Sequence, residues 1–71
     1  MEDEVIKKKA QFYLDTNTPI HIPLSNNRFY NGKIKYIGAD FLLIEELKFG
    51  EVYPFFLEIE DILPYREREE Q

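Results

Sequence analysis

The side chains best suited to chemistry in this chain are basic, amide and aromatic groups that lie close together in the sequence. They are Asn26, Asn27, Arg28, Asn31, Lys33, Lys35 and Tyr36. This combination suits a single-stranded nucleic acid, because cations attract the phosphates while amides and flat rings contact the bases. We therefore treat these residues as candidates for binding a single strand.

A simpler interpretation of the same residues stands beside this one. Lys33 and Lys35 fit the solvated face of a strand, and Asn26 and Asn27 favour turns. Three basic residues are also ordinary for a protein surface. Residue types alone favour the simpler interpretation, although assembly of several copies would multiply one small basic patch.

Other chemistries have weaker support. Acidic side chains could pair for acid–base work or bind a divalent cation. They include Asp40, Glu45, Glu46, Glu58, Glu60 and Asp61, and a solvated acidic rim is the simpler expectation for them. The chain has no Cys and one His, which excludes a multi-histidine metal site and a cysteine nucleophile with its base. We expect no catalysis, no cofactor and no metal, and we expect His21 to face outward from a strand.

The charge of the 71-residue chain is acidic overall, at −5, but it is uneven. Residues 19–40 carry three basic residues and one acid, whereas residues 41–71 carry three basic residues and nine acids. Overall acidity argues against charge-driven binding to a duplex and leaves room for a local basic face. No apolar stretch approaches the roughly 20 residues of a membrane span. With no Cys present, we expect a cytoplasmic protein.

One helix and five strands are expected to position these groups. Ile6, Ala10 and Leu14 recur at helical spacing, and Pro19 follows a run of turn-forming residues. After Pro19 the apolar period changes to two. We predict a helix over about 2–14, strands over about 19–24, 28–37, 41–47, 52–57 and 62–65, a 3₁₀ turn over 58–61 and a solvated tail over 66–71.

Gly32 lies inside the second predicted strand, where a glycine marks a strong bend or a close approach of another backbone. Short strands with such a bend curl into a barrel. The expected fold is one mostly β domain, residues 1–71, with an N-terminal α-helix and a five-stranded, strongly bent antiparallel barrel. On the second strand we expect one face to carry Tyr30, Gly32, Ile34 and Tyr36, and the other Asn31, Lys33 and Lys35.

Two nearly unbroken apolar runs, residues 41–44 and 52–57, predict strands covered on both faces. In a chain this short, the second cover must be the N-terminal helix or another copy of the protein. Exposed apolar strand edges invite pairing between copies. We therefore predict a homo-oligomer whose interface includes Val52, Tyr53, Phe55, Phe56, Leu57, Ile62 and Leu63.

The chain resembles the Sm/LSm superfamily over about residues 3–65. The resemblance is carried by three segments: Ile20-x-Ile22-x-Leu24, the bent-strand sequence of residues 28–34 (RFYNGKI) and residues 38–44 (GADFLLI). It implies that the helix caps an SH3-like barrel, that strands four and five of neighbouring subunits pair to form a ring, and that RNA binds at the ring. It also adds Asp40 to the candidate binding residues.

Two positions depart from the pattern of that superfamily. Its first motif has an Asn three residues after the Asp, and here Leu43 follows Asp40. Its second motif has Arg-Gly before the last strand, and here that turn holds Glu60 and Asp61. A uracil-specific pocket of the usual kind is therefore not expected. Two hypotheses stay open: a ring that binds single-stranded RNA or DNA, and an oligomeric protein-interaction or structural module.

Overall fold

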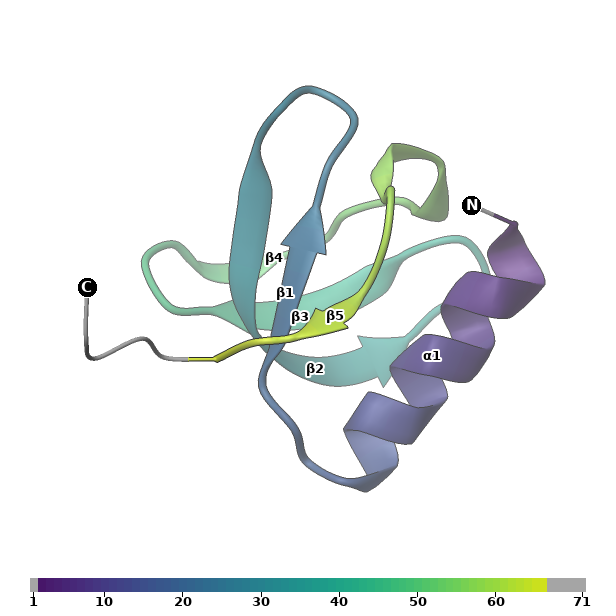
Figure 1. Ribbon diagram of the computed structural model, residues 1–71, viewed down its shortest axis with the longest axis horizontal. Helices are drawn as coiled ribbons and strands as arrows, with labels where there is room; N and C mark the ends of the chain where they lie inside the picture. The colour runs from purple at the N-terminus through teal and green to yellow at the C-terminus, as the bar shows by residue number, and fades with distance from the viewer. Residues whose placement is uncertain (1, 67–71) are drawn as a thin grey trace.

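The computed structural model describes residues 2–66 and contains one N-terminal helix followed by a five-stranded antiparallel sheet (Figure 1). The strand order is β4-β3-β2-β1-β5. This confirms the predicted mostly β architecture with a leading helix. In chain order the elements are α1 (Asp3–Asp15), β1 (Ile20–Pro23), β2 (Phe29–Ile37), β3 (Leu42–Glu46), β4 (Gly50–Val52), the 3₁₀ helix η1 (Phe56–Glu58) and β5 (Leu63–Pro64).

β2 is shared by two halves of the sheet (Figure 1), and Gly32 is the residue that pairs with both neighbouring strands. Residues 29–32 pair with β1, and residues 32–37 pair with β3. A Cβ atom at Gly32 would overlap the carbonyl oxygen of Glu45 and would stand 2.9 Å from the Cα of Glu46. The missing side chain therefore lets β2 and β3 approach closely where the strand turns.

The sheet is open within residues 2–66, so the closed barrel expected from the sequence is not formed by its strands. β4 pairs with β3, and β5 pairs with β1, at opposite edges. The segment between these edges makes only isolated bridges, Phe41 with Phe55 and Leu24 with Ile59. Pro54 has no N–H to donate to a ladder, and this contributes to the break in regular pairing.

The fourth strand is where the sequence prediction was wrong. β4 is confined to Gly50–Val52, and η1 begins at Phe56 inside the predicted strand rather than at residue 58. Gly50, the first residue of β4, has a φ of +79° where the chain leaves the preceding turn. The remaining elements agree with the predicted ranges to within a few residues. Of the predicted tail, residues 67–71 lie outside the described part of the chain.

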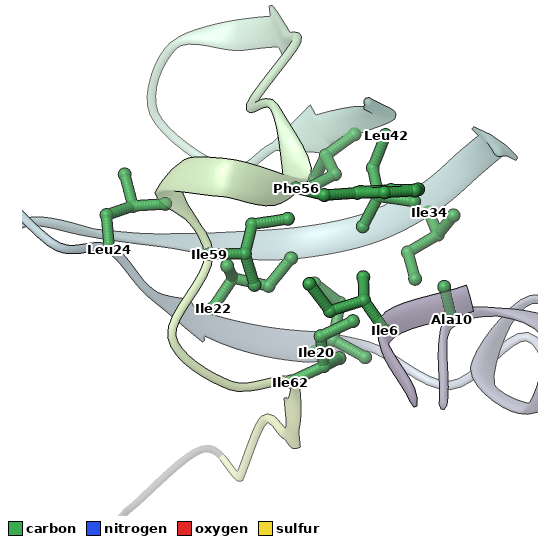
Figure 2. Close-up of a cluster of buried hydrophobic side chains, with 11 residues drawn as sticks. Ile6, Ala10, Ile20, Ile22, Leu24, Ile34, Leu42, Phe56, Ile59 and Ile62 are labelled. Atoms are coloured by element: carbon green, nitrogen blue, oxygen red, sulfur yellow. The ribbon is translucent and has the colours of Figure 1, made fainter. Parts of the chain in front are cut away.

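The core fills the space between the inner face of the sheet, α1 and the segment around η1 (Figure 2). Phe56 and Ile62 are 2% and 1% exposed, which corrects their assignment to a subunit interface. They are not available to a second copy because the protomer's own core already surrounds them. The buried cluster comprises Ile6, Ala10, Ile20, Ile22, Leu24, Ile34, Leu42, Ile44, Phe56, Ile59 and Ile62.

α1 packs on the core through Ile6 and Ala10, and its lysines make further contacts outside the sheet. Lys9 Nζ lies 2.8 Å from Asp61 Oδ1, and this hydrogen-bonded pair lowers the pKa of the Asp61 carboxyl. Lys7 Nζ lies 5.9 Å from the centre of the Phe56 ring. These contacts connect the helix to the chain segment between β4 and β5.

Candidate nucleic-acid interface

A groove runs between the ends of two hairpins, the β1–β2 hairpin and the β3–β4 hairpin. It is lined by residues 27–31 of the first, residues 46–49 of the second and Tyr65. We call this surface the hairpin groove. Its lining includes two cations, Arg28 and Lys48, both exposed. Phe29 and Phe49 add aromatic rings that are 54% and 69% exposed.

Glu46 holds the two hairpins together from beneath the groove. Its side chain is 6% exposed and accepts three backbone hydrogen bonds. The Asn31 N–H donates to Oε2 at 3.0 Å, and the N–H groups of Lys48 and Phe49 donate to Oε1 at 2.7 and 2.9 Å. The sequence placed Glu46 on a solvated acidic rim, and the structure corrects this, because the carboxylate satisfies backbone donors that strand pairing leaves free.

Two opposing effects set the pKa of Glu46. Burial is the largest effect and favours the neutral acid, but the three backbone donors and the nearby Lys48 charge together outweigh it. The pKa of Glu46 is therefore lowered below its ordinary value of 4.5. A carboxyl with a depressed folded-state pKa contributes stability above its unfolded pKa and loses that contribution as the pH falls through the folded value.

Glu46→Gln is expected to destabilise the fold by about 2 kcal/mol at neutral pH, because an amide offers one acceptor oxygen and turns its NH₂ toward backbone donors. The parent protein should lose this extra stability as the pH falls below 4.5. In acid, urea unfolding should therefore give similar free energies of unfolding for the parent and for Glu46→Gln. Glu45→Gln is the matched control. Glu45 is exposed and pairs with Lys35 at 3.4 Å, so its loss should cost under about 1 kcal/mol. Equal costs for both variants at neutral pH would contradict this role of Glu46.

The structure brings together only some of the candidates named from the sequence. Asn27, Arg28 and Asn31 line the hairpin groove, and Lys33 lines an adjoining depression that also reaches Tyr65. Lys35 forms an ion pair with Glu45. Tyr36 lies near the end of β2 that is away from the groove, and Asp40 lies in the bend that follows this strand.

Asn26 and Asn27 also supply the turn geometry that the simpler interpretation required. Asn26 Oδ1 accepts a hydrogen bond from the Arg28 N–H at 3.0 Å. Asn27 adopts a φ of 68°, in the left-handed region that asparagine tolerates better than most residues. Asn27 thus shapes the hairpin end and also lines the groove.

An irregularity in β2 changes the face on which Tyr36 lies. Ile34 pairs with Ile44, but Tyr36 pairs with Leu43, so the register shifts between them. Tyr36 was expected to share the inner face of Ile34, yet it is 56% exposed, and Ile37 packs on the core instead. The bulge corrects this part of the prediction, because one extra residue reverses the alternation of faces.

His21 lies on the outer face beside the groove, as the sequence indicated. Its Nδ1 is 2.6 Å from Asn31 Oδ1, and its ring centre is 5.2 Å from that of Phe29. Lys48, Phe49 and Tyr65 line the groove but were not identified from the sequence. Lys48 and Phe49 are placed by the β2–β3 register, which brings the end of β3 beside the start of β2. Tyr65 is placed by the pairing of β5 with β1.

No family model matches this chain, and no curated protein matches it. Neither comparison assigns it to a family. None of the helices formed by residues 2–66 has the length and apolar composition needed to cross a membrane.

Proposed function

We propose that this protein is a non-catalytic, Sm-like module that binds single-stranded RNA or DNA in the hairpin groove. The observation that carries the proposal is the convergence of Arg28, Lys48 and exposed aromatic rings at the ends of two hairpins. Single strands are bound by grooves that combine positive charge for the backbone with rings on which bases stack.

In this proposal each type of side chain contacts a different portion of the nucleic acid. Arg28 and Lys48 contact phosphates, and Phe29 and Phe49 stack on bases. The amides of Asn27 and Asn31 lie in the same groove and offer hydrogen bonds to base edges. Stacking accepts any base, so we expect weak sequence preference. This agrees with the absence, at Leu43 and Glu60, of the residues that make the usual uracil pocket in the superfamily.

The order of the elements supports the Sm-like part of the proposal. A leading helix, a second strand that pairs with both β1 and β3, and the order β4-β3-β2-β1-β5 fit the topology that the resemblance implies. β4 and β5 are at the two edges of the sheet. We propose that β4 of one protomer pairs with β5 of the next in a ring, which repeats the groove around the assembly.

The interface of such a ring uses fewer residues than the sequence indicated. Val52 is partly buried against the core, whereas Tyr53, Phe55, Leu57 and Leu63 are exposed. Pairing of the β4 edge with the β5 edge would cover Val52 and Leu63 without disturbing the core. Tyr53, Phe55 and Leu57 follow β4 and stay outside this pairing. The net charge of −5 favours the rival function, an oligomeric protein-interaction module without nucleic-acid binding.

Arg28→Ala and Lys48→Ala are each expected to weaken binding of short homopolymeric RNA and DNA several-fold at low salt, measured by fluorescence anisotropy. Each lost phosphate contact should also reduce the salt slope by about 0.7. Phe49→Ala should cost about 1–3 kcal/mol of binding free energy, because one stacking platform is lost.

The control for these variants is Lys8→Ala. It makes the same change of charge on the exposed side of α1 and should leave binding within about two-fold. Equal losses of oligonucleotide affinity for Lys8→Ala and Lys48→Ala would show that binding depends on overall charge, and would contradict a defined groove. Absence of binding to every oligonucleotide at low salt would contradict the proposed function and favour the rival.

A further inference from the structure

A second surface lies at the opposite end of β3 from the hairpin groove and consists of aromatic side chains. Phe41 directly precedes β3, and its ring centre is 6.1 Å from that of Tyr36 and 6.4 Å from that of Tyr53. Phe55 is bridged to Phe41 in the backbone pairing. We call these four residues the aromatic strip.

The rings of the strip are held in place and remain accessible. A Cβ atom at Gly38 would overlap the Phe41 ring, so the glycine leaves the space in which that ring lies. The bulge in β2 turns Tyr36 outward. Tyr36, Tyr53 and Phe55 are each at least half exposed. Such a gathering of exposed rings at one place marks an interaction surface.

The charges around the strip are acidic. The Tyr53 hydroxyl donates to a Glu51 carboxylate oxygen at 3.3 Å, and the Phe55 N–H donates to Glu58 Oε1 at 3.4 Å. Asp40 directly precedes Phe41 and is exposed. The nearby cation Lys35, next to Tyr36 in the chain, is paired with Glu45. The strip therefore offers aromatic faces and carboxylates to a positively charged partner.

We propose that the aromatic strip binds an arginine-containing segment of a partner protein. A guanidinium group stacks on aromatic faces, is weakly hydrated and pairs with carboxylates in a fixed planar geometry. Lysine is a poorer fit, because its ammonium group is compact and strongly hydrated. A nucleic acid is disfavoured here, because its phosphates would meet Asp40, Glu51 and Glu58.

This surface is independent of the hairpin groove. The strip lies where β3 begins, and the groove lies where β3 ends at Glu46. The two can be tested with different probes and different variants. A negative result for peptide binding at the strip would not contradict nucleic-acid binding in the groove, and the reverse also holds.

The test uses a short synthetic peptide that alternates Arg and Gly, titrated against the full chain and followed by calorimetry. Its matched probes replace every Arg by Lys or by Glu. We expect the Arg peptide to bind, the Lys peptide to bind at least several-fold more weakly and the Glu peptide not to bind. Tyr53→Ala and Glu51→Gln should each weaken the Arg peptide at least about five-fold, because each removes one recognition element. Both positions are exposed, so the fold should be retained.

The control variants are Arg28→Ala and Lys48→Ala, which should leave peptide binding unchanged. Absence of binding, equal binding of the Arg and Lys peptides, or equal binding by Tyr53→Ala would overturn the proposal. Two further results would assign the strip differently. Loss of oligonucleotide binding in Tyr53→Ala without loss of peptide binding would make the strip part of a nucleic-acid site. A smaller solution mass for Tyr53→Ala, with peptide binding intact, would make it an interface between copies.

Discussion

Phe56→Asp is expected to abolish cooperative folding. Phe56 is 2% exposed and belongs to the core cluster between α1 and the sheet (Figure 2). Removing a buried phenylalanine ring costs about 3–5 kcal/mol, and burying an unpaired carboxylate adds several more. A domain of this length has a total stability of about 4–10 kcal/mol. Circular dichroism should therefore show no cooperative thermal transition for this variant.

Leu57→Asp is the matched control, one residue away on the same 3₁₀ helix. Leu57 is 93% exposed, so the same substitution should move the melting temperature by no more than about 4 °C. Its mass in solution then reports on assembly, because the fold stays intact. A Phe56→Asp variant that melts near the parent temperature but fails to assemble would contradict the core described above. It would show that Phe56 lies at the subunit interface.

Gly32→Ala is expected to destabilise the protein by about 3 kcal/mol, which is a large share of its total stability. The added Cβ would overlap the carbonyl oxygen of Glu45. Relief requires β2 and β3 to move apart at the point where Gly32 pairs with Glu46. Glu46 is the residue at this point and accepts a hydrogen bond from the Asn31 N–H, so the floor of the hairpin groove should loosen as well. Urea unfolding measures the stability change.

Gly50→Asn is the control for this substitution. Gly50 has a φ of +79° with open space around it, and asparagine adopts such a conformation at modest cost. We expect it to cost under about 1 kcal/mol. A Gly32→Ala variant as stable as Gly50→Asn would show that β2 and β3 do not depend on the close approach at Gly32.

Much of the fold could be predicted from local pattern. The spacing of Ile6, Ala10 and Leu14 indicated α1, and the change to a period of two after Pro19 indicated the sheet. Gly32 indicated the close approach of a second backbone. The fourth strand could not be placed in this way, because the apolar residues continue past Pro54 while the backbone leaves the ladder. Apolar content alone does not distinguish a strand from a 3₁₀ helix that buries Phe56.

The candidate site could be predicted only in part. Arg28 and Asn31 were identified because they lie close together in the sequence with other polar groups. Lys48 and Phe49 reach the same groove through the pairing of β2 with β3, and this register is not visible in residue types. Glu46 was misassigned because glutamates are usually solvated. Its burial depends on three backbone N–H groups that converge only in the folded chain.

The most direct test of the proposed function is an amide-shift titration by NMR, in which isotopically labelled protein receives a short single-stranded oligonucleotide at low salt. Saturable shifts are expected at residues 27–31 and 46–49 and at Tyr65, with no shifts at the aromatic strip. An absence of shifts, or shifts confined to surfaces outside the hairpin groove, would contradict it.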